Sequence, residues 1–445
     1  MASGGKWIDG QSRRITASLA VARALLIALS AAALHAPGAV AASPADPLLS
    51  PPAFVISTEP PQKSFDAFLA DVRTEARTRG IRSSTLTRAF DGLEPDLRMP
   101  DLVRSPRTQR KRKRGQPEFI RPPADYLDRR QLERLAGTGQ RLAKKHADAL
   151  AQIQRRFGVR PAVVLAIWGR ETAFGGYRLR HDAIRALATQ AWTGRRRVKF
   201  RKELLLALAL LDDGRVTRKD MRSSWAGAMG PTQLLPSNVR DHGTDIDGDG
   251  RIDIWRSLPD ALGAAAKSLV DNGWQSGRTW GWEVRLPASF DCTLEGPRTQ
   301  RTVADWRAAG LARTSGRAFP ANAASENAYI LLPEGTRGPA FLMHRNFLVL
   351  KSYNYADLYA LFVGHLADRI AGGGDFNTAW ATRTQLPKHR IEDIQAALNA
   401  AGFAAGKVDG RAGTITRNAI GAFQKARGLP VDCYPSRDVW QALTR

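Results

Sequence analysis

Hydrophobic residues recur at helical spacing over most of this 445-residue chain. The first clear stripe contains Phe65, Phe68 and Val72, which are separated by three and four positions. This spacing predicts an amphipathic helix with one buried face. Gly80 follows the stripe, and a glycine in that place is typical of a helix end. Globular structure is therefore expected to begin near Ser64.

Two later segments are apolar on nearly every side. Pro161 precedes the apolar run 163–168, and proline favours the first turn of a helix. Residues 201–213 contain six leucines and predict a further helix. Helices that are apolar all round lie inside a larger domain. Both segments are therefore expected in the interior of one domain.

The pattern changes twice in the second half of the chain. Residues 280–286 and 329–332 are short and strand-like, whereas residues 359–370 return to helical spacing before the glycines 372–374. Residues 388–445 carry their own helical stripes and predict a separate small module. The expected fold class is mainly α (α+β), with a small strand-containing region and a small helical C-terminal domain.

The N-terminal residues have the order of a secretory signal. Basic residues precede the apolar stretch 24–34, and Ala39, Val40 and Ala41 supply the small side chains of a cleavage site. The apolar stretch is shorter than the about 20 residues that span a membrane. We therefore expect a cleaved signal peptide at 1–41, a proline-rich linker at 42–63, and a periplasmic protein.

The formal net charge of +25 favours contact with a polyanion. Export favours an anionic envelope surface over nucleic acid, and no nucleic acid is expected. The basic run 110–114 is interpreted as a solvated loop, with a grip on an anionic surface as the alternative. The two cysteines, Cys292 and Cys433, fall in different expected domains and are interpreted as unrelated thiols, although export permits their oxidation.

Glu171 stands near the end of the apolar helix that Pro161 begins. Burial raises the pKa of a carboxyl group, so a glutamate in this place is a candidate general acid. The alternative is a structural glutamate paired with Arg170 or Arg178. The residues alone leave both interpretations open.

Residues 224–233 combine small residues with polar ones at the two ends. Glycines in such a segment allow the backbone to approach a ligand, and Gln233 carries both a donor and an acceptor. Ser224 begins the segment with a hydroxyl group. A tight structural turn explains the same composition equally well.

Residues 245–253 have the spacing of an EF-hand-like calcium loop. Acidic oxygens stand at positions 1, 3, 5 and 9, glycine at position 6, and Arg251 at position 7, which in such loops contributes its carbonyl. Position 12 is Arg256, so Asp260 is the expected substitute ligand. The predicted ligands of a structural Ca²⁺ are Asp245, Asp247, Asp249, Arg251 and Asp260. An acidic turn without metal is the alternative, and no organic cofactor is expected.

In this order, the motifs resemble the membrane-bound lytic murein transglycosylase B family from about Phe65 to Gly372. The anchors are residues 116–119, 168–172, 224–233, the acidic loop, 341–347 and 353–354. The resemblance implies a lysozyme-like catalytic domain at 64–384. It also implies Glu171 as the sole catalytic acid and base, with Ser224, Gln233, Asn354 and Tyr353 as substrate contacts.

Two positions depart from the family pattern. Ser268 stands where the prototype has an active-site tyrosine, and Ala356 stands where a serine is often found. Neither departure affects the acid. Both concern the contacts to the sugar.

Residues 388–445 resemble the peptidoglycan-binding type 1 domain, and the resemblance implies a small three-helix unit. The matching motifs are 394–395, 408–410, 413–414, 416, 419–420 and 423–424, whereas Cys433 replaces a usual glycine. The resemblance implies binding to peptidoglycan glycan strands. Linking a weak binder to a catalytic domain raises its effective concentration at a polymer surface.

The resemblance implies cleavage of the β-1,4 bond from N-acetylmuramic acid to N-acetylglucosamine, with 1,6-anhydromuramoyl products and a monomeric enzyme. Glycoside hydrolysis normally uses two carboxylates. A hydrolytic muramidase is the nearest alternative and requires a second essential carboxylate. A non-catalytic wall-binding protein is an alternative from another class.

Overall fold

The computed structural model describes residues 48, 55–103, 117–381 and 385–444. The expected signal peptide, most of the linker and the basic run 110–114 lie outside the described residues. No helix in the described part of the chain has the length and apolar character needed to cross a membrane.

The N-terminal stripe forms α1 (Phe65–Thr78), as its spacing predicted. The Ser64 hydroxyl caps this helix by accepting from the backbone N–H of Ala67 at 3.2 Å, and Gly80 ends the turn with φ +84°. The apolar face of α1 shares a core with three helices: α2 (Ser83–Phe90), α8 (Ala183–Thr193) and α9 (Arg197–Asp212).

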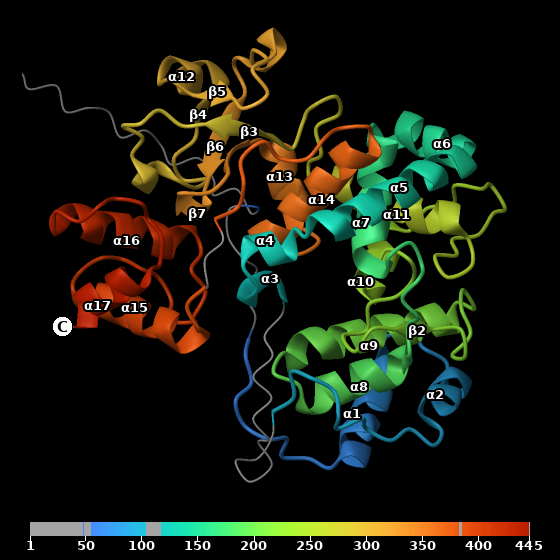
Figure 1. Cartoon of the computed structure of the whole chain (residues 1–445). Coiled ribbons are helices and arrows are strands. Elements are labelled where there is room, and N and C mark those ends of the chain that lie inside the picture. The colour runs from blue at the N-terminus through green and yellow to red at the C-terminus, as the bar shows by residue number, and fades with distance from the viewer. Residues whose placement is uncertain (1–47, 49–54, 104–116, 382–384, 445) are drawn as a thin grey trace, which may run out of the picture. The chain divides into compact units, whose positions relative to one another are not determined.

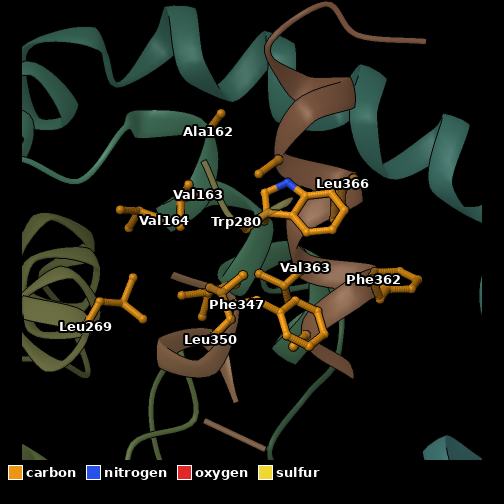
Figure 2. Packing of buried hydrophobic residues seen from close by; sticks show 14 of the residues in the cluster. Ala162, Val163, Val164, Leu269, Trp280, Phe347, Leu350, Phe362, Val363 and Leu366 are labelled. Atoms are coloured by element: carbon orange, nitrogen blue, oxygen red, sulfur yellow. The ribbon is translucent and has the colours of Figure 1, made fainter. Parts of the chain in front are cut away.

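A second core surrounds α7 (Pro161–Thr172), which is buried along most of its length. It lies beside α14 (Asp357–Ile370) and α5 (Arg129–Lys145), as Figure 1 shows. Figure 2 shows Val163 of α7 among Trp280, Phe347 and Val363 from other elements. The remaining helices of this part are α3 (Pro117–Ile120), α4 (Pro123–Tyr126), α6 (Ala147–Phe157), α10 (Pro236–His242), α11 (Leu258–Asp271) and α13 (Arg345–Leu350).

The strand-like runs form an antiparallel sheet in the order β4-β6-β8-β3-β5. Trp282 of β3 pairs with Leu342 of β8, and Ile330 of β6 pairs with the same residue on the other side. The five strands of this sheet are β3 (Gly281–Arg285), β4 (Arg301–Thr302), β5 (Ala312–Arg313), β6 (Asn327–Leu331) and β8 (Ala340–Met343). The same region contains β7 (Pro333–Thr336), α12 (Val303–Ala308) and the 3-10 helices η3 (Cys292–Leu294) and η4 (Ala321–Ala323). A separate short pair joins β1 (His181–Asp182) to β2 (Arg222–Ser223).

The C-terminal residues form the expected three helices, α15 (Lys388–Ala400), α16 (Thr414–Ala426) and α17 (Arg437–Thr444). Ile394, Leu398, Ile420 and Phe423 fill a core of their own. A separate core is what a separate module requires.

A disulfide between Cys292 and Cys433 joins this module to the strand region. The interpretation of two unrelated thiols was therefore wrong. The two cysteines are 141 positions apart and were expected in different domains, so the sequence contained no indication that they are bonded. Beside the bond, Arg417 of α16 donates through Nε to a Glu295 carboxylate oxygen at 2.9 Å, and both side chains are buried.

Candidate active site

Glu171 is the penultimate residue of α7 and its side chain is partly buried. The helix stops directly after it because Ala173 and Phe174 adopt left-handed backbone conformations, with φ of 49° and 58°. The turn folds the Phe174 ring back onto Gly169, where an added Cβ would lie 2.7 Å from the ring. Gly169 therefore allows the turn that presents Glu171 at the helix end.

Tyr359 of α14 is the direct partner of this glutamate. Its hydroxyl donates a hydrogen bond to Glu171 Oε1. The burial of Tyr359 and the neighbouring Glu171 charge raise the pKa of the phenol well above its usual value. Tyr359 therefore stays protonated and acts as a fixed donor, which leaves Oε2 as the oxygen that can carry the carboxyl proton.

Burial raises the pKa of Glu171 from 4.5 to about 7. The hydrogen bond from Tyr359 and the Arg170 charge act in the opposite direction, whereas the negative charge of Glu118 raises this pKa further. Near neutral pH, both the protonated and the ionised carboxyl are populated. One group can therefore donate a proton and later accept one.

The structural alternative for Glu171 was an ion pair with Arg170 or Arg178. Among the described residues, no ion pair joins Glu171 to either arginine. The Arg170 guanidinium instead lies 4.8 Å from the centre of the Tyr126 ring and donates to the Tyr126 hydroxyl. Its charge therefore stays close to the acid without binding the carboxylate directly.

Tyr353 and Asn354 lie on the same side of the site, just before α14. The Tyr353 hydroxyl is buried and has no hydrogen-bond partner among the described residues. Asn354 donates through Nδ2 to Glu118 Oε1 at 2.8 Å and accepts the backbone N–H of Ala356 at 3.1 Å. These bonds fix the orientation of the Asn354 amide.

The segment from Ser224 to Gln233 forms a tight turn that meets the end of α7. The Thr172 hydroxyl donates to the Pro231 carbonyl at 2.8 Å. Gln233, with φ 55°, donates through Nε2 to the Gly230 carbonyl at 3.1 Å, so its amide oxygen is the group left to meet a ligand. Ser224 accepts the backbone N–H of Ala228 through its hydroxyl at 3.3 Å. The segment is therefore a tight structural turn, and it also contacts the end of the helix that carries Glu171.

A cavity of about 190 Å³ opens beside this contact. Tyr177 is 67 % exposed at its rim and is free to contact a sugar, whereas Trp280 is 3 % exposed and belongs to the core. The cavity walls are formed by Thr172, Gly175, Tyr177, Leu179, Asp220, Arg222, Gly230, Pro231 and Trp255. Thr172, the residue after Glu171, lines this cavity, which makes the cavity a candidate sugar subsite.

The acidic loop brings three of its predicted ligands together. Carboxylate oxygens of Asp245, Asp247 and Asp249 lie within 4.8 Å of one another. One Ca²⁺ at 2.3–2.6 Å from each oxygen fits that spacing. Asp260 lies outside this cluster, and its two oxygens accept the backbone N–H groups of Ile246 at 2.7 Å and Asp253 at 2.9 Å.

Comparison with known proteins identifies the family of this chain. The transglycosylase SLT domain family matches residues 64–368, which is more than half of the chain. The chain belongs to this family of lytic transglycosylases. A putative peptidoglycan binding domain matches residues 388–443, the three-helix module.

This transglycosylase resembles two solved structures of SltB3 from Pseudomonas aeruginosa. One is in complex with NAG-NAM-pentapeptide, at 39% identity and a TM-score of 0.78, covering 86% of this chain and 100% of that chain. The other is in complex with NAG-anhNAM-pentapeptide, at 38% identity, a TM-score of 0.77 and the same coverage. The curated membrane-bound lytic murein transglycosylase B of Escherichia coli (strain K12) is 28% identical over 233 residues, which span 51% of this chain and 61% of that protein.

Sequence reasoning missed the role of two side chains in this transglycosylase site. Tyr359 was assigned to a helix and not to the site, although it follows the Asn354 motif by five positions. Glu118 was noted as part of a motif without a role. Both act through a buried contact across elements that are far apart in the sequence, and no local pattern reveals such a contact.

Proposed function

We propose that this chain cleaves the β-1,4 bond between N-acetylmuramic acid and N-acetylglucosamine in peptidoglycan and forms 1,6-anhydromuramoyl products. The observation that carries the proposal is a glutamate with a pKa of about 7 that is hydrogen-bonded by a phenol and not paired with a cation. This environment suits a group that acts first as an acid and then as a base.

The first step is protonation of the glycosidic oxygen by Glu171, with cleavage of the bond at C1 of the muramoyl residue. The N-acetyl oxygen of that residue stabilises the positive charge that develops at C1. The ionised Glu171 then removes the proton of the C6 hydroxyl, whose oxygen bonds to C1. Glu171 regains its proton, so one carboxyl group completes the cycle and no water is consumed.

Substrate contacts are proposed for Ser224, Gln233, Tyr353 and Asn354. The free amide oxygen of Gln233 and the unpaired hydroxyl of Tyr353 provide an acceptor and a donor for a sugar or an N-acetyl group. The complexes of SltB3 with NAG-NAM-pentapeptide and NAG-anhNAM-pentapeptide support a peptidoglycan substrate and an anhydro product.

Mass spectrometry of digested peptidoglycan tests the reaction. Transglycosylation yields fragments one water lighter than those of a hydrolytic muramidase, because the C6 oxygen replaces water. Reducing ends in place of anhydro ends would move the chain to the muramidase class. Absence of any cleavage by the folded protein, with retained binding to sacculi, would identify a wall-binding protein.

The C-terminal module, residues 388–445, is proposed to bind glycan strands. The disulfide and the Glu295–Arg417 pair indicate that it is held against the catalytic region at 64–384 and is not a loosely tethered binder. Sacculus binding by Cys433→Ser and by the wild type, measured in parallel, tests this arrangement. A fixed module predicts weaker binding after loss of the bond, and a freely tethered module predicts no change.

Export to the periplasm by a cleaved signal peptide at 1–41 is proposed from the sequence order, and the relatives act on murein, a periplasmic polymer. The chain is proposed to act as a monomer, and its basic surface to contact the anionic envelope. N-terminal sequencing of the mature protein from a periplasmic extract tests the cleavage point. A start near residue 42 is expected, and an intact N-terminus would contradict it.

Loop 245–253 is proposed to bind a structural Ca²⁺ through Asp245, Asp247, Asp249 and the Arg251 carbonyl. The spacing of the three carboxylates supports the site. Asp260 anchors both ends of the loop through backbone N–H groups. The ion would balance the concentrated negative charge and stiffen the loop.

A further inference from the structure

Glu118 is a buried carboxylate of α3 that the reaction described above does not use. Its side chain belongs to a residue that is 8 % exposed, and Oε1 accepts the Asn354 amide N–H at 2.8 Å. Buried charged groups persist in proteins when they are paired or serve a function. Among the described residues, no ion pair is formed by Glu118.

The bond to Glu118 determines what Asn354 can offer a substrate. With Oδ1 bound to the Ala356 N–H and one amide hydrogen bound to Glu118, a single N–H of Asn354 remains. The amide therefore cannot turn over to present its oxygen. A fixed N–H suits a substrate carbonyl, such as that of an N-acetyl group.

Glu118 also contributes to the charge balance around Glu171. The groups that face the acid are Arg170 of its own helix, Tyr359 of α14, Tyr353, Tyr126 of α4 and Glu118 of α3. Arg170 is the cation of this set and favours the ionised acid, whereas the charge of Glu118 raises the pKa of both Glu171 and Tyr126. Removal of Glu118 leaves the Arg170 charge without this opposing charge.

We propose that Glu118 is a positioning residue of the active site, which fixes the orientation of Asn354 and opposes the charge of Arg170 so that Glu171 keeps its proton. The inference rests on the proposed role of Glu171 as the acid. It assigns no bond-making step to Glu118, because its bound oxygen is directed to Asn354.

Two substitutions separate the hydrogen bond from the charge. Glu118→Gln keeps an acceptor for Asn354 and removes the charge, whereas Glu118→Ala removes both. Glu118→Gln is expected to move the alkaline limb of kcat/KM to lower pH by about 0.5–1 unit. Glu118→Ala is expected to add a roughly tenfold loss of kcat/KM, because Asn354 loses the hydrogen bond that orients its amide. Glu94→Gln removes an equal charge from an exposed position and serves as the control.

A second measurement does not depend on turnover. The difference in thermal stability between Glu171→Gln and its parent stops changing with pH at the folded-state pKa of Glu171, and this pH should be lower in the Glu118→Gln background. Coincident profiles of Glu118→Gln, Glu94→Gln and wild type in both measurements would overturn the proposal. Loss of all cleavage in folded Glu118→Gln would instead make Glu118 a second catalytic carboxylate. Failure of the transglycosylase function itself is recognised separately, by reducing-end products of the wild type.

Discussion

Two glutamates in this molecule occupy enclosed sites with opposite consequences. Glu295 is 1 % exposed and receives the Arg417 guanidinium through two N–H groups, together with the backbone N–H of Leu332 at 2.9 Å. Glu171 receives a phenol hydroxyl and has no cation on its carboxylate among the described residues. Glu295 is therefore a structural group joining α16 to the strand region, whereas Glu171 keeps a proton that it can transfer near neutral pH.

Burial raises the pKa of both carboxyl groups, so the hydrogen-bond partner is the feature that distinguishes the two sites. A buried carboxylate with a bidentate arginine is part of an ion pair whose loss leaves a bare charge. A buried carboxyl next to neutral hydroxyls stays close to its protonated form. Placing Arg170 on the ring of Tyr126 keeps the nearest cation of the active site away from such a pair.

The largest expected effect is the loss of activity in Glu171→Gln. The variant keeps an oxygen for the Tyr359 hydrogen bond but has no proton to transfer, so kcat/KM should fall about a thousandfold. Release of soluble muropeptides from purified sacculi measures this, with Glu94→Gln as the control. Activity within tenfold of the wild type would show that the acid is another residue.

Glu295→Gln should destabilise the protein and leave the pH profile of activity unchanged. It leaves Arg417 buried without its partner, at a cost of about 3–5 kcal/mol. Glu392→Gln, which removes an exposed i,i+4 pair with Lys388, should cost about 0.5 kcal/mol or less. Denaturant unfolding compares the two variants. Equal small losses would mean that the Glu295 pair is dispensable.

Tyr359→Phe should raise the pKa of Glu171 further, because the lost hydrogen bond favours the ionised form. The alkaline limb of kcat/KM should move to higher pH, and kcat should fall about tenfold as the carboxyl loses its fixed orientation. The pH profile of the variant measures both. A limb that moves to lower pH would contradict the assigned direction.

The smallest expected effect is that of metal removal. EDTA should lower the melting temperature by a few degrees, about the shift that 1 kcal/mol produces, and added Ca²⁺ should restore it. Asp249→Asn should show little response to either, whereas exposed Asp91→Asn should respond as the wild type does. A wild-type melting temperature that is unaffected by both treatments would contradict Ca²⁺ binding by the acidic loop.

Local patterns in the sequence predicted the helices well. Pro161 begins α7 because proline restricts the backbone to a conformation that suits the first helical turn. Gly80 ends the turn after α1 because glycine can adopt a positive φ. The strand runs at 280–286 and 329–332 became β3 and β6 with boundaries shifted by one residue or a little more. These features depend on neighbouring residues, which a sequence displays directly.

The site was less predictable where it depends on distant contacts. Glu171 and the turn near Gln233 were identified from motifs, but Tyr359, Glu118 and the disulfide partner of Cys292 were not. Each of these contacts joins side chains from separate elements across buried space. Spacing along one element contains no information about them.

The most direct test of the account is the difference in unfolding free energy between the wild type and Glu171→Gln from pH 4 to pH 9. Glu171 has a pKa raised in the folded state from 4.5 to about 7, so the folded protein retains a proton that the unfolded chain releases between these values. The wild type should match the variant near pH 4. It should lose stability relative to the variant above pH 5, by roughly 3 kcal/mol at most above pH 7. A difference that stays flat, or that favours the wild type as pH rises, would contradict a protonated Glu171.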